Sequence, residues 1–137
     1  MMAVKIALSL LGALALVVAL WNVAFQWRLQ RHHGMSRDAF LAYFAERGVG
    51  VEAAAAIYDY YRPRAIWRNF GISPQDEIAV LFNQEGDDTD DDLMRILKNL
   101  GLSMPSDEAW EARGIPLLKT AEDLVRVVAW AAEVQRS

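Results

Sequence analysis

An apolar run of twenty residues near the N-terminus constrains this chain more than any other feature. Between Ile6 and Phe25 only a serine, a glycine and an asparagine interrupt alanine, leucine, valine, isoleucine and aromatic side chains. An α-helix rises about 1.5 Å per residue, so the run matches a bilayer hydrocarbon core of about 30 Å. We therefore expect residues 6–25 to span a membrane once, within a transmembrane anchor formed by residues 1–30.

The residues that flank this run predict its orientation. Trp27 suits the aromatic belt of a membrane interface, and Arg28, Arg31 and Arg37 outweigh the positive charge of Lys5 and the terminal amine on the other side. Positive charge is enriched on the cytoplasmic side of membrane helices. The sequence therefore predicts a single-pass membrane protein whose domain lies on the cytoplasmic side.

A cleaved signal peptide is the alternative interpretation of the same segment. Lys5 would then supply a minimal charged region, and the remaining chain would be secreted. The apolar run is longer than the apolar region of a usual signal peptide, and no convincing small-x-small cleavage site lies between the run and Trp27. The anchor is therefore preferred.

Composition excludes several classes of function. The net charge of −4 argues against nucleic acid as a partner, because phosphate binding needs a basic face. The absence of cysteine excludes disulfides, thiolate metal sites and cysteine nucleophiles. The only histidines, His32 and His33, are adjacent and cannot supply a tetrahedral metal site by themselves. We expect no catalytic residue, no metal site and no enzymatic activity.

The rest of the chain predicts an all-α domain over residues 37–137, joined to the anchor by a linker at residues 31–36. Apolar residues recur at helical spacing, and no segment alternates with a period of two. Expected helices cover residues 37–47 after the cap Ser36, 51–62 before a break at Pro63, a short helix opened by Ser73 and Pro74, 90–100 capped by Asp88 or Thr89, 108–110, and a last helix opened by Thr120 and Asp123.

A cluster of acids lies where the chain enters its clearest core helix. It consists of Asp87, Asp88, Asp90, Asp91 and Asp92. An EF-hand does not fit, because Leu93 would occupy the turn-glycine position and Asn99 the position of the bidentate glutamate. Acids at a helix N-terminus are stabilised by the macrodipole at roughly 0.3–1 kcal/mol each. The sequence predicts an acidic helix start that can dock a basic partner.

A second candidate surface combines arginines with aromatic side chains. Arg62, Arg64 and Arg68 lie close to Trp67 and to three tyrosines in the sequence. Such a patch can bind an anionic lipid headgroup or an acidic partner. Tyrosines at this spacing are equally typical of a core that leaves their hydroxyls hydrated.

Two stretches resemble the acyl carrier proteins, and more closely the carrier-like domains of unknown function that lack the modified serine. In residues 86–94 (GDDTDDDLM) a turn ends in an Asp-hydroxyl pair and opens a long helix, as the Asp-Ser-Leu motif of carriers does. Residues 115–125 (IPLLKTAEDLV) are similar to the loop and capped start of the carrier's last helix. The resemblance covers residues 76–130 and implies a carrier-like helical bundle that docks its partners through the acidic helix. Thr89 occupies the position of the modified serine, and Asp90 that of the following leucine.

Three functional hypotheses follow. The first is a non-enzymatic, membrane-anchored docking module without a cofactor, whose five aspartates bind a protein partner. The second is an acyl or peptidyl carrier with phosphopantetheine on Thr89, although a threonine is a crowded nucleophile. The third is an anionic-lipid-binding assembly factor that uses Arg62, Arg64, Arg68 and Trp67.

Overall fold

The computed structural model describes residues 1–114 and 117–136, and within them the fold is all-α. The elements are α1 (Met2–Gln30), α2 (Arg37–Glu46), α3 (Val51–Tyr61), the 3-10 helix η1 (Arg62–Arg64), α4 (Ile78–Leu81), α5 (Gly86–Asn99), α6 (Asp107–Arg113) and α7 (Ala121–Arg136). The described residues contain no strand, and an isolated bridge joins Glu77 to Thr120. The predicted fold class is confirmed.

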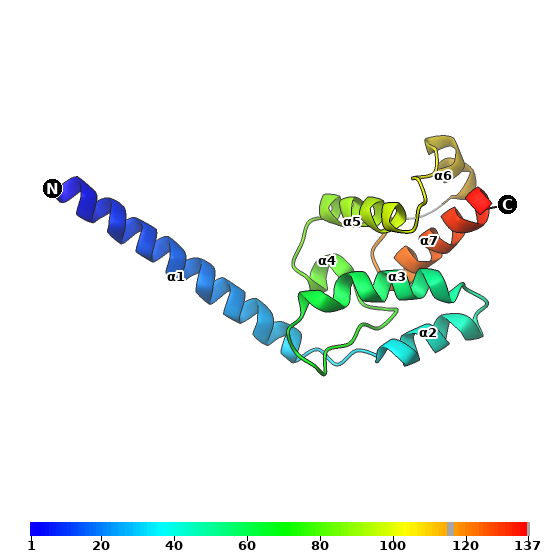
Figure 1. Ribbon diagram of the computed structural model, residues 1–137, viewed down its shortest axis with the longest axis horizontal. Helices are drawn as coiled ribbons and strands as arrows, with labels where there is room; N and C mark the ends of the chain where they lie inside the picture. Colours follow the sequence, from blue (N-terminus) through cyan, green and yellow to red (C-terminus); the bar gives the residue numbers. More distant parts are fainter. Residues whose placement is uncertain (115–116, 137) are drawn as a thin grey trace.

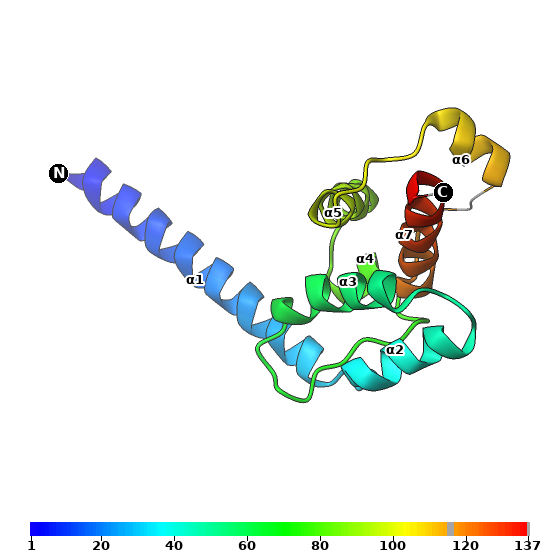
Figure 2. The same ribbon diagram turned by 45° about the vertical axis from the view of Figure 1, so that its right-hand side comes forward.

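Helix α1 projects away from a helical domain that holds all the other elements (Figures 1 and 2). Residues 2–24 of the helix are exposed, and the helix is long and apolar enough to cross a membrane. The last turns behave differently, because Leu29 is completely buried and Phe25 packs against the core of the domain. Helix α1 therefore ends inside the domain that it carries.

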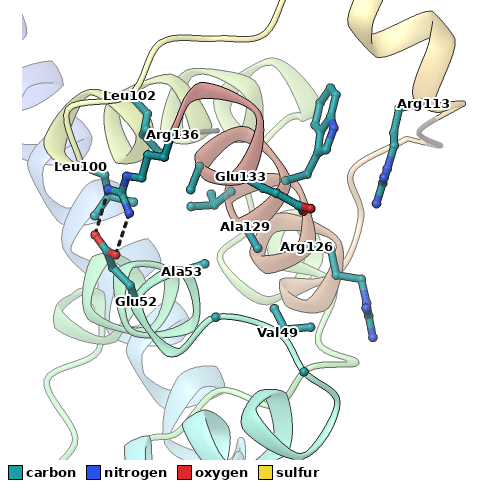
Figure 3. A pocket seen from close by; sticks show the side chains of 15 residues that line it. Val49, Glu52, Ala53, Leu100, Leu102, Arg113, Arg126, Ala129, Glu133 and Arg136 are labelled. Atoms are coloured by element: carbon teal, nitrogen blue, oxygen red, sulfur yellow. Dashed lines mark hydrogen bonds and ion pairs between the residues drawn. The ribbon is translucent and has the colours of Figure 1, made fainter.

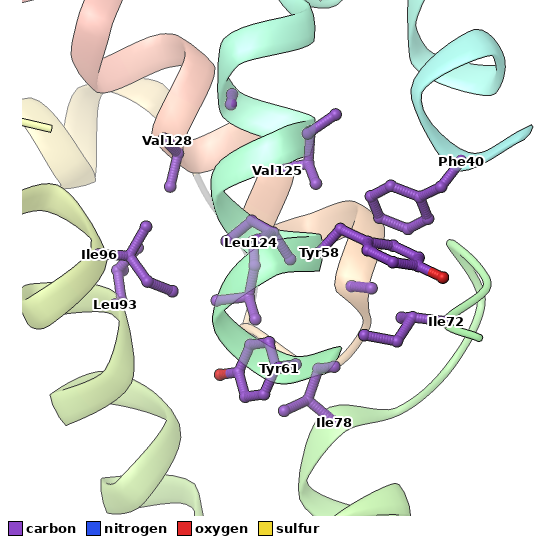
Figure 4. Close-up of a cluster of buried hydrophobic side chains, with 14 of the residues drawn as sticks. Phe40, Tyr58, Tyr61, Ile72, Ile78, Leu93, Ile96, Leu124, Val125 and Val128 are labelled. Atoms are coloured by element: carbon purple, nitrogen blue, oxygen red, sulfur yellow. The ribbon is translucent and has the colours of Figure 1, made fainter. Parts of the chain in front are cut away.

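Helix α3 lies at the centre of the domain, with α2 and α7 packed against it and α5 alongside. Its side chains Ile57 and Tyr61 are completely buried and belong to the same core cluster as Leu93 from α5 and Leu124 from α7. Figure 4 shows the cluster, with side chains from α3, α5 and α7 pointing toward one another. Burying a side chain of this size contributes about 1.5–3 kcal/mol, so these contacts hold the domain together.

Local signals explain several helix ends. The Ser36 hydroxyl accepts a hydrogen bond from the Ala39 amide at 3.3 Å, which confirms the predicted cap of α2. Thr120 and Asp123 each accept a hydrogen bond from the other's amide, at 3.2 and 3.0 Å, so the predicted capping box of α7 is also confirmed. The expected break at Pro63 is present, because α3 gives way to η1 at Arg62.

Two predicted helix starts are wrong. Pro74 does not open a helix but lies in a turn closed by a 3.0 Å hydrogen bond from the Asp76 amide to the Ser73 carbonyl, and α4 begins only at Ile78. Helix α5 begins at Gly86 and is capped by Glu85, not by Asp88 or Thr89. Its capping box pairs Glu85 with Asp88, so the predicted turn is already the first turn of the helix.

Residues 31–36 connect α1 to α2 and are packed against the domain. The Met35 carbonyl accepts a hydrogen bond from the Tyr58 hydroxyl at 2.9 Å. Gly34 and Gly71 approach so closely that a Cβ at either position would overlap the backbone of the other segment. The segment therefore fixes α1 to the domain rather than leaving it on a free tether.

Candidate functional site

Four of the five predicted docking acids lie on the surface at the beginning of α5. They are Asp87, Asp88, Asp90 and Asp91, and all four are exposed. Within residues 1–114 and 117–136 no basic side chain forms an ion pair with any of them. The helix start therefore presents several uncompensated negative charges to its surroundings.

The prediction that the fifth acid, Asp92, belongs to the exposed docking set is wrong. Its side chain is buried, with the residue only 3% exposed, and its carboxylate accepts hydrogen bonds from the hydroxyls of Tyr60 at 2.8 Å and Tyr61 at 2.9 Å. Arg64 lies 3.4 Å from the same carboxylate and forms an ion pair with it. Asp92 holds α5 against α3 and η1 instead of facing a partner.

Gln84 completes this buried polar network. Its amide nitrogen donates to Asp92 at 3.1 Å and to the Thr89 hydroxyl at 3.0 Å, while its amide oxygen accepts from Arg64 at 2.6 Å. No buried side-chain nitrogen or oxygen of the described residues lacks a partner. Buried polar groups carry little penalty when they are all paired, so the network specifies how α5 is seated.

The pKa values of the two tyrosines in this network are raised. Burial raises the pKa of Tyr61, and the neighbouring negative charge of Asp92 raises it further. Burial and the hydrogen bond to Asp92 raise the pKa of Tyr60 in the same direction. Both hydroxyls therefore stay protonated and act as hydrogen-bond donors at neutral pH.

Thr89, the predicted modification position, is enclosed by the same network. The residue is 2% exposed and its hydroxyl accepts a hydrogen bond from Gln84. A phosphopantetheine transferase would need this oxygen at the surface. Modification would therefore require the beginning of α5 to move away from Gln84.

The predicted arginine patch is divided among structural contacts. The Arg62 guanidinium donates to the carbonyls of Ala65, Trp67 and Arg68, where it closes the loop after η1. Arg64 is held by Gln84 and Asp92, whereas Arg68 is exposed. Three arginines that are close in sequence therefore do not form one open basic surface.

Trp67 and Arg64 connect this loop to α1 through Gln26. The Trp67 indole donates to the Gln26 carbonyl at 2.7 Å, and the Gln26 amide donates to the Arg64 carbonyl at 3.3 Å. The Arg28 guanidinium donates to the carbonyls of Val80 at 3.1 Å and Leu81 at 3.0 Å. A continuous set of hydrogen bonds thus runs from the end of α1 through Arg64 to Gln84 and Asp92 of the α5 region.

His32 adds a further tie beside α1. Its Nε2 atom donates to the Asp76 carboxylate at 2.9 Å, and that carboxylate also accepts from the Ser73 amide at 2.7 Å. His33 is exposed. His32 thus fixes the chain after α1 against the turn that precedes α4, a contact that the sequence did not predict.

A shallow groove of about 480 Å³ lies on the other side of the domain, between α3, the end of α5 and α7 (Figure 3). Ala53, Leu100 and Ala129 are among its apolar lining residues. Arg136 donates to Glu52 at 3.0 Å at one end of the groove. No pattern in the sequence predicts this groove.

Within the described residues, no three histidine, cysteine, aspartate or glutamate side chains converge as a metal site. Comparisons of the chain with models of protein families, with curated proteins and with solved structures found no match. The resemblance to acyl carrier proteins therefore rests on the two sequence stretches, and residues 115–116 of the second stretch lie outside the described residues.

One sequence signal could have identified the buried members of the network. The apolar stripe of α5 contains Leu93, Ile96 and Leu97, and the same face continued toward the N-terminus includes Thr89 and Asp92. Polar side chains on a buried face need partners, so their position predicts a network. Nothing in the local sequence identifies Gln84 and Arg64 as those partners, because they come from other segments.

Proposed function

We propose that this protein is a non-enzymatic, membrane-anchored docking module. Helix α1 crosses the membrane, and the helical domain on the cytoplasmic side binds a basic segment of another protein through Asp87, Asp88, Asp90 and Asp91. The main support for this proposal is that α1 is attached to the domain. Leu29, in the last turn of α1, is completely buried.

This attachment supports docking because it orients the domain as well as tethering it. A flexible tether raises only the local concentration of a binding surface. A helix whose last turns belong to the core also keeps each face of the domain in a fixed direction relative to the membrane. Helix α5 lies on the α1 side of the domain and α6 on the far side (Figures 1 and 2).

The position of the acids favours a partner near the membrane surface. Gln84, two residues before α5, is joined through Arg64 to Gln26, the first residue after the apolar run. Juxtamembrane segments on the cytoplasmic side of membrane proteins are rich in lysine and arginine. Uncompensated acids attract such segments over about one Debye length, roughly 8 Å at physiological salt.

The carrier hypothesis has less support, because Thr89 is buried and hydrogen-bonded to Gln84. The arginine-patch hypothesis also has less support, because the guanidinium groups of Arg62 and Arg64 already serve contacts inside the domain. The exposed acids have no such internal role beyond the contact of Asp88 with the Glu85 amide.

A charge-neutralised variant tests the proposal. Asp87, Asp88, Asp90 and Asp91 are changed to asparagine in the full-length protein, and amine-to-amine chemical cross-linking, which does not consume carboxylates, is carried out in native membranes. A matched control changes four other exposed acids to glutamine. These are Glu46, Glu108, Glu111 and Glu133.

The expected result is a cross-linked partner that the wild type and the control retain and the asparagine variant loses. Cross-links should map to lysines of a basic juxtamembrane segment and weaken as salt is raised. An identical set of partners in the wild type and the asparagine variant would contradict the docking function.

A further inference from the structure

Two strongly exposed apolar side chains lie where α1 enters the domain. Ile66 is 71% exposed and Val80 is 64% exposed, and only Leu117 exceeds them among the large apolar side chains described in the domain. Isolated apolar residues are common on soluble surfaces, so exposure alone decides nothing. Ile66 and Val80 differ from such isolated residues because they lie beside the end of the membrane anchor.

Hydrogen bonds hold both residues next to the end of the apolar run. The Ile66 amide donates to the Gln26 side-chain oxygen at 3.4 Å, and the Val80 carbonyl accepts from Arg28 at 3.1 Å. Gln26 directly follows the run that ends at Phe25. The interfacial layer on each side of a bilayer is roughly 5–7 Å thick. Side chains held this close to Gln26 and Arg28 can reach that layer.

The surrounding side chains suit the same environment. Trp27 is 59% exposed on α1, and tryptophan is enriched at the headgroup level of membranes. Arg31 and Arg68 are exposed nearby in the chain and can pair with lipid phosphates. Exposed apolar side chains combined with tryptophan and arginine are typical of a surface that binds in the interfacial layer of a bilayer.

We propose that the side of the domain next to the end of α1, here called its base, is seated in the bilayer interface. Ile66 and Val80 are the side chains that enter the interface. The inference rests on the proposed function only in that α1 must span the membrane. The occupant of this surface is lipid, because the surface is continuous with the membrane-spanning helix. Seating the base in this way would hold the beginning of α5 close to the headgroups, where a basic juxtamembrane partner is found.

Fluorescent labelling tests the seating directly, because the chain contains no cysteine that would compete with an introduced one. Single variants Ile66→Cys, Val80→Cys, Val51→Cys and Val17→Cys carry an environment-sensitive dye in the full-length protein, reconstituted in phosphatidylcholine vesicles. Separate sets of vesicles contain lipids with a nitroxide quencher at the headgroup, high in the acyl chain or deep in the acyl chain. Val51 is the matched control, since it is an exposed valine at the end of α3 far from η1.

The proposal predicts that shallow nitroxide lipids quench the dyes at positions 66 and 80 and leave the dye at position 51 bright. Quenching at position 17 by deep nitroxides, together with no quenching at 66 and 80, would overturn the seating and leave the anchor intact. A protein surface on Ile66 and Val80 would give that same pattern. Failure of the dye at position 17 to respond would overturn the anchor and the seating together.

Discussion

Replacing Asp92 with alanine should destabilise the domain by about 3 kcal/mol. Removing one partner of a fully buried ion pair costs about 3–5 kcal/mol, but the Arg64 side chain is 36% exposed, so solvent offsets part of that loss. The buried hydroxyl of Tyr61 loses its acceptor, which costs about 1–3 kcal/mol, whereas Tyr60 is partly exposed and can turn toward water.

The assay is equilibrium unfolding in urea of the full-length protein in detergent micelles, followed by near-ultraviolet circular dichroism. Asp91→Ala is the matched control, because Asp91 is the adjacent exposed acid of the same helix, and its change should stay within about 0.5 kcal/mol. Asp92→Asn keeps the shape of the side chain and should cost less than Asp92→Ala. Equal unfolding midpoints for Asp92→Ala and Asp91→Ala would refute a structural role for the network.

Three further predictions concern the packing of the domain. Gly34→Ala should cost about 2 kcal/mol or more, because the added Cβ meets the backbone at Gly71, whereas Gly86→Ala faces open space and should cost nothing; urea unfolding compares the two. The free energy of unfolding should fall as the pH rises above about 10, because a tyrosine in the unfolded chain ionises there while burial keeps the pKa of Tyr61 higher in the folded domain. This fall, measured between about pH 9 and about pH 11, should be smaller in Tyr61→Phe. Leu29→Ala should cost about 2–5 kcal/mol by thermal unfolding, and a cost below about 1 kcal/mol would show that the end of α1 is not part of the core.

Local signals made much of the fold predictable. Ser36 caps α2, Pro63 ends α3, and Thr120 with Asp123 opens α7, because each of these depends on residues within one helical turn. The apolar run of α1 depends on composition and length, which are also read from one segment.

One local feature and several features that depend on distant segments were missed. Two cap assignments competed at the beginning of α5, and the sequence did not reveal that Glu85 would pair with Asp88 and leave Thr89 inside. Asp92 looked like a fifth surface acid, because its partners come from α3, η1 and the segment before α5. Tertiary packing decides which polar side chains of an amphipathic helix are buried.

The attachment of α1 was the largest feature that the sequence did not predict. Residues 31–36 have the composition of a connecting segment, and their packing depends on the close approach of Gly34 to Gly71 and on contacts of Met35 and His32 with segments far along the chain. A single-sequence pattern contains no information on these pairings. The oriented domain therefore emerged only from the three-dimensional arrangement.

Helix α1 and the helical domain form one unit, joined through the buried Leu29. Spin labels on Leu16→Cys in α1 and Lys98→Cys on the exposed side of α5 allow a pulsed electron paramagnetic resonance measurement of the distance between them in reconstituted vesicles. We expect one narrow distance distribution, because buried Leu29 and the contacts of Gln26 and Arg28 fix the two parts together. A broad distribution, as expected for a domain on a flexible linker, would contradict it.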